Sequence, residues 1–165
     1  MKKRFAQQGF SMSERLLTPG TIEAELEAHG VYASNTRGSS MEPLFRNHRD
    51  MVIISKPERA IKKYDVVLYP KGEEDYILHR VIAVRDDCYV IRGDNTFIKE
   101  RVPKQAIIGV LTEFNRKGKR HSVRDLSYRI YSRVWCWLYP VRAMLRGLRI
   151  LLGRARRAIF PKKKR

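Results

Sequence analysis

Between residues 51 and 114 the chain is divided into short apolar runs, and this division limits the folds open to it. Each run is rich in β-branched or aromatic residues and is bounded by a proline, a glycine or an acidic turn. The runs lie at residues 51–54, 65–69, 76–85, 88–92 and 106–114. Runs of this length are typical of strands. We therefore expect a mainly β fold, a compact antiparallel domain.

A small N-terminal helix is expected before the strands, over residues 22–29. Thr21 can cap its first turn, and Gly30 can end it in a left-handed conformation.

After the last strand the period of the apolar residues changes to that of a helix. Ser122 and Asp125 form a capping-box pattern, and apolar residues then recur every three or four positions as far as Leu152. Arginines occupy the other faces, and Pro140 divides the pattern. We expect an amphipathic helical tail in two segments.

The charge of the chain is unevenly distributed. There are 35 Lys and Arg against 17 Asp and Glu, a formal net charge of +18. Residues 1–114 carry 18 basic and 16 acidic side chains, whereas residues 115–165 carry 17 basic side chains and one acid. The sequence thus indicates three parts: an N-terminal segment (1–30), a nearly neutral β domain (31–114) and a basic amphipathic tail (115–165).

A basic tail of this kind favours a polyanionic partner. Trp135, Trp137 and several leucines lie beside the arginines, and this composition is typical of helices in the interface of an anionic membrane. Two alternatives remain open: the apolar stripe packs onto the β domain, or the tail binds nucleic acid.

The remaining composition indicates neither disulfides nor a metal site. Cys88 and Cys136 are too few for a disulfide framework, and neither occurs in a metal-ligand spacing, so we expect no metal and no cofactor. The first residues contain no apolar stretch of the secretory type, and no stretch is long enough to span a bilayer. We expect a cytoplasmic protein that associates peripherally with a membrane.

The segment Gly38-Ser39-Ser40-Met41-Glu42-Pro43 has the properties of a nucleophile loop. A nucleophilic serine needs a tight backbone that exposes its hydroxyl and directs N–H groups at a developing oxyanion. Gly38 permits such a turn, and Pro43 stiffens its end. An ordinary turn has the same composition, so this segment alone leaves both interpretations open.

His79 and Asp94 are the other candidates for chemistry. In a strand, Ile77, His79 and Val81 share one face, and their apolar surroundings favour the neutral, proton-accepting imidazole. Asp94 lies in a Gly93-Asp94-Asn95 turn, from which it could orient His79 or brace the nucleophile loop. A strand histidine and such a turn are also common structural features.

The order and spacing of these three segments resemble the family that unites type I signal peptidases with self-cleaving SOS-type repressors. In that family a Ser-Met-x-Pro box supplies the nucleophile, a strand with Lys-Arg-Val or His-Arg-Val supplies the base, and a Gly-Asp-Asn box follows. The matching segments here are Ser40-Met41-Glu42-Pro43, His79-Arg80-Val81 and Gly93-Asp94-Asn95. Histidine as the base is the variant of the endoplasmic-reticulum and archaeal enzymes.

The resemblance implies a serine endopeptidase that cleaves leader or precursor peptides, with residues 31–114 as the peptidase domain. Ser40, His79 and Asp94 would be catalytic; the Ser40 N–H would hold the oxyanion, with Ser39, Gly38 and Met41 as further oxyanion or substrate-binding residues. The substrate would bind as an extended strand beside residues 51–54. Three alternatives remain: a self-cleaving repressor-type regulator, a nucleic-acid-binding protein and an inactive β module that binds peptides.

Overall fold

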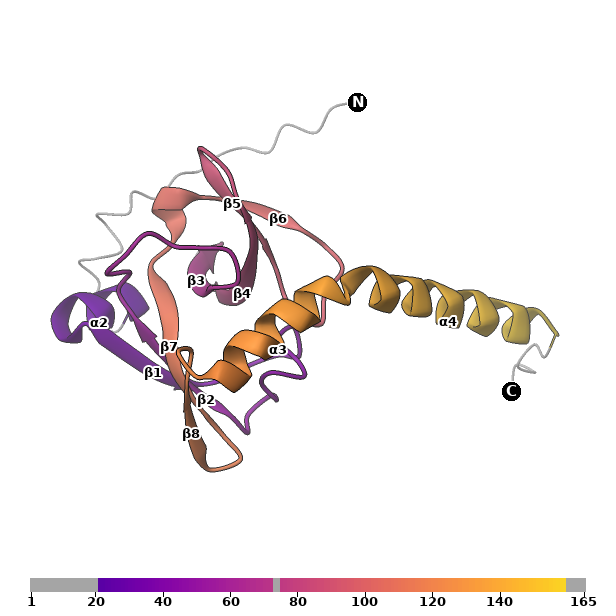
Figure 1. The fold of residues 1–165 in the computed structure, drawn as a ribbon, viewed down its shortest axis with the longest axis horizontal. Helices are drawn as coiled ribbons and strands as arrows, with labels where there is room; N and C mark the ends of the chain where they lie inside the picture. Colours follow the sequence, from indigo (N-terminus) through magenta and orange to yellow (C-terminus); the bar gives the residue numbers. More distant parts are fainter. Residues whose placement is uncertain (1–20, 73–74, 160–165) are drawn as a thin grey trace.

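The computed structural model describes residues 21–72 and 75–159, and Figure 1 shows them as one antiparallel sheet with helices before and after it. The strands are β1 (Val31–Asn35), β2 (Met51–Ser55), β3 (Val66–Lys71), β4 (Asp75–Val84), β5 (Cys88–Arg92), β6 (Glu100–Pro103), β7 (Gly109–Arg116) and β8 (Lys119–Ser122). The helices are α2 (Ile22–His29), α3 (Leu126–Trp137) and α4 (Tyr139–Ile159), with a 3₁₀ turn at Lys104–Ala106. Residues 1–20, the greater part of the N-terminal segment, residues 73–74 and the C-terminal residues 160–165 lie outside this description.

The sheet has the order β1-β2-β7-β3-β4-β5-β6, and β8 pairs with β7. This confirms the mainly antiparallel β fold and all five expected strands. Strands β1, β6 and β8 were not expected. Strands β6 and β8 contain few apolar residues, and β1 is formed by pairing with β2, which follows only after the Ser40 loop. The sheet also continues past Phe114, where we placed the end of the β domain, as far as Ser122.

Strand β3 lies between two apolar cores. Val66 and Leu68 face one core, which also contains Leu26 of α2 and Tyr128 of α3. Val67 and Tyr69 face the other core, with Val81 of β4. Because successive strand side chains point to opposite faces, β4 presents His79 and Arg80 to different sides of the sheet.

Helix α2 begins and ends as its sequence predicts. The Thr21 hydroxyl accepts a hydrogen bond from the Ala24 N–H at 3.2 Å. Gly30 has φ 72°, and its N–H donates to the Leu26 carbonyl at 2.9 Å. The left-handed φ at this position is the reason that glycine suits it.

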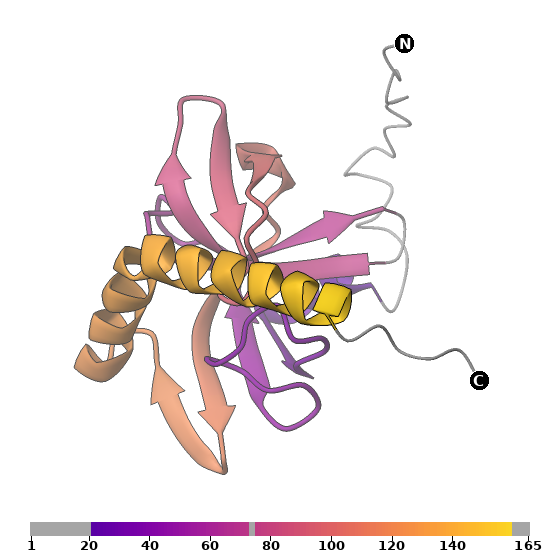
Figure 2. The same cartoon turned by 90° about the vertical axis from the view of Figure 1, so that its right-hand side faces the viewer.

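The C-terminal helices also follow the predicted pattern. The Ser122 N–H donates to the Asp125 carboxylate, and the Arg124 N–H donates to the Ser122 hydroxyl, in a capping turn just before α3. The break between the helices falls at Leu138, immediately before Tyr139 and Pro140. Helix α3 lies against the sheet, whereas α4 projects away from it, and the two meet at a marked angle (Figures 1 and 2).

The apolar stripe of the tail is exposed. Its members, Leu126, Ile130, Val134, Val141, Leu145, Leu148 and Leu152, are between 46% and 69% exposed. For these residues the alternative that the stripe packs onto the β domain is wrong. It holds in part elsewhere in the tail: Leu138 is half-buried, and the half-buried Trp135 contacts the turn at Asp94. Helix α3 packs through a different face, on which Tyr128 and Ser132 are buried. None of the described helices is long and apolar enough to cross a membrane.

Candidate active site

The loop that carries Ser40 is closed at its two ends by hydrogen bonds. The Thr36 hydroxyl donates to the carbonyls of Arg46 and Asp50, and the Thr36 N–H donates to the Asp50 carbonyl. The buried Asp50 carboxylate accepts from the Arg46 N–H and from the Arg49 guanidinium. These contacts hold both ends of the loop at the junction of β1 and β2.

Within the loop, the backbone turns sharply before Ser40. Gly38 has φ 78°, which favours glycine, and its N–H donates to the Asn47 side chain at 2.9 Å. Met41 is buried in the first core, so the loop is fixed immediately after Ser40. The Ser40 side chain itself is half-buried. No acceptor in the described part of the chain takes the Ser40 N–H, which leaves it free for an oxyanion.

His79 is held at its Nδ1 edge by two residues that the sequence analysis did not identify. The Tyr69 hydroxyl lies 3.4 Å from His79 Nδ1 and donates to Glu100 Oε2 at 3.1 Å. Glu100 Oε1 lies 3.9 Å from the same nitrogen. Burial, together with Glu100, raises the pKa of Tyr69, so its hydroxyl keeps its proton. The arrangement favours the tautomer in which Nδ1–H donates to Tyr69 and Nε2 is free to accept a proton.

The surroundings of His79 also favour its neutral form. The residue is only 6% exposed, and this burial lowers the pKa of His79 below its ordinary value. Glu100 opposes the shift, and Lys71, which forms an ion pair with Glu100 at 3.3 Å, adds to it. A neutral imidazole is the form required of a general base.

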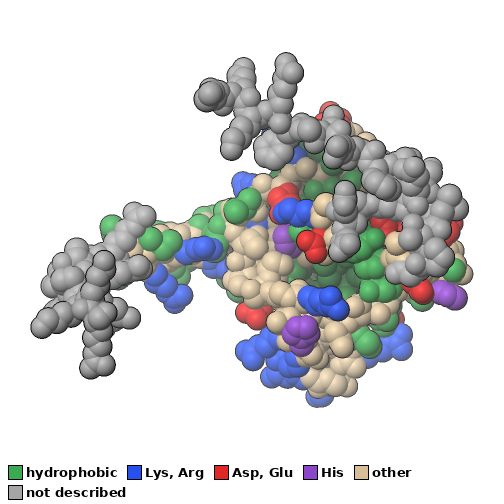
Figure 3. Space-filling model, turned by 180° about the vertical axis from the view of Figure 1, so that it is seen from behind, with side chains coloured by type: hydrophobic (Ala, Val, Ile, Leu, Met, Phe, Trp, Pro, Cys, Tyr) green, Lys and Arg blue, Asp and Glu red, His purple; other side chains and the backbone are tan. Residues whose placement is uncertain are grey.

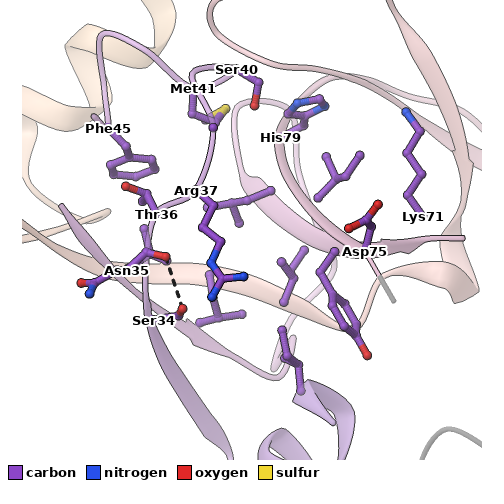
Figure 4. Close-up of a pocket in the computed structure, with 18 of the residues that line it drawn as sticks. Ser34, Asn35, Thr36, Arg37, Ser40, Met41, Phe45, Lys71, Asp75 and His79 are labelled. Atoms are coloured by element: carbon purple, nitrogen blue, oxygen red, sulfur yellow. Dashed lines mark hydrogen bonds between the residues drawn. The ribbon is translucent and has the colours of Figure 1, made fainter. Parts of the chain in front are cut away.

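Ser40 and His79 meet around Gly93. A Cβ atom at Gly93 would lie 2.6 Å from the Ser40 carbonyl oxygen and 2.9 Å from His79 Nε2. Both residues therefore flank the same point, and Figure 4 shows the Ser40 side chain turned toward the His79 ring. Their side chains are not hydrogen-bonded here; such contacts are often long in free enzymes and shorten when substrate binds.

The turn after Gly93 braces the Ser40 loop. The Asn95 N–H donates to the Ser40 carbonyl at 2.8 Å, and the Asn95 side chain donates to the Ser39 carbonyl at 3.2 Å. Of the two roles expected of Asp94, the bracing of this loop is thus carried out by its neighbour Asn95 and not by Asp94.

The other role, that Asp94 orients His79, is corrected by the structure. Both Asp94 oxygens accept hydrogen bonds from Arg80 at 2.8 Å, and Oδ2 also accepts from Tyr131 at 3.0 Å. Asp94 influences His79 only as a nearby charge. Its carboxylate serves instead as the counterion of a guanidinium that is fully buried.

Arg80 connects this turn to helix α3. Besides Asp94, it donates to the Tyr128 and Ser132 hydroxyls, both of which are buried. Burial opposes the charge, but the Asp94 carboxylate raises the pKa of Arg80 well above its ordinary value. Helix α3 is therefore part of the β unit and not a detachable portion of the tail.

The site opens into a cavity of about 530 Å³ (Figure 4). Its lining includes Ser40, His79 and Glu100, with Tyr32 and Ser34 of β1 along one side. Residues 51–54, which we expected to present an edge to substrate, form part of β2, and β2 is paired on both sides, with β1 and β7. The expectation is wrong because β1 occupies that edge. Among the described strands, β1 pairs only with β2 and leads directly to Ser40.

The other predicted site residues are placed as follows. Ser39 is exposed and contributes its carbonyl to Asn95, and Gly38 lines the cavity with Met41. Glu100 had no sequence signal, since its strand was not recognised. In the described part of the chain, no group of three or more His, Cys, Asp or Glu side chains could hold a metal ion.

No protein-family model matches the chain, and no curated protein matches it significantly.

Proposed function

We propose that the chain is a serine endopeptidase that cleaves leader or precursor peptides, with Ser40 as nucleophile and His79 as general base. The observation that carries the proposal is the meeting of Ser40 and His79 around Gly93, at the rim of a cavity large enough for peptide side chains. The resemblance to signal peptidases in three ordered boxes points to the same residues.

The reaction is acyl transfer in two steps. His79 Nε2 takes the Ser40 hydroxyl proton as Ser40 Oγ attacks the peptide carbonyl, and the Ser40 N–H stabilises the oxyanion. The imidazolium then gives its proton to the leaving amine, and the acyl-enzyme forms. Water, deprotonated by His79, hydrolyses the ester and restores Ser40. Tyr69 and Glu100 hold the Nδ1–H throughout.

The substrate peptide would extend the sheet at the edge of β1 that no other described strand pairs with. Main-chain hydrogen bonds to an edge strand give affinity, and alternate side chains enter pockets. Tyr32 and Ser34 of β1 line the cavity, and the strand continues into the Ser40 loop. A peptide bound in this way would bring a carbonyl to Ser40.

The test compares new N-termini produced from a proteome-derived peptide library. The wild-type protein should cleave, Ser40→Ala should not, and Ser39→Ala should retain activity within about 10²-fold, since it removes at most one oxyanion donor. Cleavage by Ser40→Ala, or its loss only in Ser39→Ala, overturns the assignment. Cleavage confined to the protein's own chain favours the repressor-type regulator, and a folded wild type without cleavage favours the peptide-binding module.

The same proposal includes peripheral binding to an anionic membrane through the tail. The support is the exposed stripe on α4, where Leu145, Leu148 and Leu152 are 46%, 50% and 60% exposed, beside arginines of a segment with 17 basic residues (Figure 3). Burial of the stripe in the interface and attraction of arginine to acidic headgroups act together. A nucleic-acid helix needs no such stripe.

A matched pair of substitutions tests the stripe. Leu148 and Ile150 are exposed to similar extents, 50% and 49%, but lie about half a turn apart on α4. Leu148→Glu should weaken co-sedimentation with vesicles containing acidic lipid much more than Ile150→Glu, although both variants change the charge equally. Equal effects, or binding to duplex DNA with no binding to vesicles, would contradict membrane association.

A further inference from the structure

The Asp94–Asn95 turn is held from two sides, and the second side belongs to the tail. On the active-site side, Asn95 donates to the Ser39 and Ser40 carbonyls. On the other side, the Asp94 carbonyl accepts a hydrogen bond from Trp135 Nε1 at 3.0 Å and another from the Arg142 guanidinium. The Asp94 carbonyl and the Asn95 N–H belong to the same peptide unit. This unit therefore contacts Trp135 and Arg142 through its carbonyl and the Ser40 loop through its N–H.

The two donors also fix the junction between α3 and α4. Trp135 lies near the end of α3 and Arg142 in the first turn of α4. The Arg142 guanidinium lies over the Trp135 ring, 3.8 Å from its centroid, and donates to the Trp135 carbonyl at 3.4 Å. Both side chains therefore reach Asp94 in a defined position, as a stacked pair.

We infer that Trp135 and Arg142 are positioning residues for the peptidase, because they hold the Asp94–Asn95 turn and, through it, the backbone of Ser40. The inference rests on the proposed function. It assigns to the start of the tail a role in catalysis that is separate from any role in membrane binding. A displacement of the turn moves the Ser40 carbonyl and N–H relative to His79, and active-site geometry tolerates only about 0.5 Å of such movement.

The test uses the full chain, a short synthetic peptide and no membrane. Trp135→Phe keeps an aromatic ring but removes the Nε1–H donor, and Trp137→Phe is its control, since Trp137 is 78% exposed on the same helix. Arg142→Lys is paired with Arg149→Lys, because Arg149 is exposed two turns further along α4. Active sites are counted by stoichiometric labelling of Ser40 with a serine-directed phosphonate.

We expect kcat per labelled site to fall about five- to tenfold in Trp135→Phe and Arg142→Lys, the effect of one weakened hydrogen bond on a placed group. KM and the pH midpoint of the acid limb should stay unchanged, because the cavity and His79 are not contacted. If Trp135 and Arg142 only stabilised the fold, their substitution would lower the fraction of molecules labelled at Ser40 without changing kcat per labelled site. Equal rates in Trp135→Phe and Trp137→Phe overturn the inference.

A second measurement does not depend on activity. Hydrogen exchange of the Asn95 N–H reports its bond to the Ser40 carbonyl in the folded protein. Exchange should be faster in Trp135→Phe than in Trp137→Phe; equal exchange overturns the inference even if no substrate is cleaved. If the wild-type protein neither cleaves the peptide nor is labelled at Ser40, the proposed function is refuted instead.

Discussion

Gly93→Ala is the sharpest perturbation that the site offers, because a single methyl group would enter the space between Ser40 and His79. The backbone at Gly93 is not in the left-handed region, so alanine suits its conformation and only the space is lacking. The new Cβ would lie 2.6 Å from the Ser40 carbonyl oxygen, 2.9 Å from His79 Nε2 and 3.0 Å from Thr96 Cγ2.

The size of the effect follows from these distances. Ordinary contact begins at 3.4 Å, so the Ser40 carbonyl must retreat by about 0.8 Å and the imidazole by about 0.5 Å. The carbonyl belongs to a backbone that Asn95 holds, and the imidazole is buried, so neither moves without cost. Misplacement on this scale lowers a rate by about 10²-fold. Overpacking should also lower the free energy of unfolding by about 1–3 kcal/mol.

The assay is kcat on a synthetic peptide, corrected for the fraction of labelled Ser40, together with urea unfolding at the same pH. Gly147→Ala is the control, since nothing lies within 4 Å of its Cβ position and it is in the middle of α4. That substitution should preserve kcat and stabilise the helix by about 0.5–1 kcal/mol. If Gly93→Ala cleaves at the wild-type rate per site, Ser40 and His79 do not act together around Gly93.

Three further predictions concern the charges and the helices. The acid limb of kcat/KM against pH should have its midpoint below about 6.5, because burial lowers the pKa of His79. Lys71→Met should raise that midpoint, because the Lys71 charge lowers the pKa of His79, and Glu100→Gln should lower it, because the Glu100 charge raises that pKa. Shifts of the opposite sign would exclude His79 as the base. Asp94→Asn should lower the free energy of unfolding by about 3–5 kcal/mol, measured in urea, because it leaves the Arg80 charge buried without a counterion; an unchanged stability would contradict this role. Deletion of residues 122–165 should abolish folding, since it removes Tyr128 and Ser132 from Arg80. Deletion of residues 150–165, which keeps Arg142 and the first half of α4, should leave the urea-unfolding midpoint and peptide cleavage intact. A folded, active chain ending at residue 121 would refute the assignment of α3 to the β unit.

Local signals in the sequence predicted a large part of this protein correctly. Thr21 and Gly30 set the limits of α2, and Pro140 follows the break between α3 and α4, because caps and breakers act within one turn of the backbone. The alternation around His79 placed it on the face that carries Ile77 and Val81. The spacing of the three boxes named Ser40 and His79, which the fold brings to one cavity.

What the sequence did not determine depends on which strands become neighbours. Asp94 was a candidate partner of His79, but in the sheet its carboxylate meets Arg80, and the Nδ1 edge of His79 meets Tyr69 and Glu100. Residues 51–54 were expected at an edge until β1 paired beside them. Such partners are chosen by the pairing of distant segments, for which the local sequence carries no signal. For that reason the sequence alone could propose Ser40 as nucleophile and His79 as base. Only the tertiary structure decided which groups lie against the Nδ1 edge of His79, which strand lies at the edge of the sheet and how Trp135 and Arg142 reach the turn that holds the Ser40 loop.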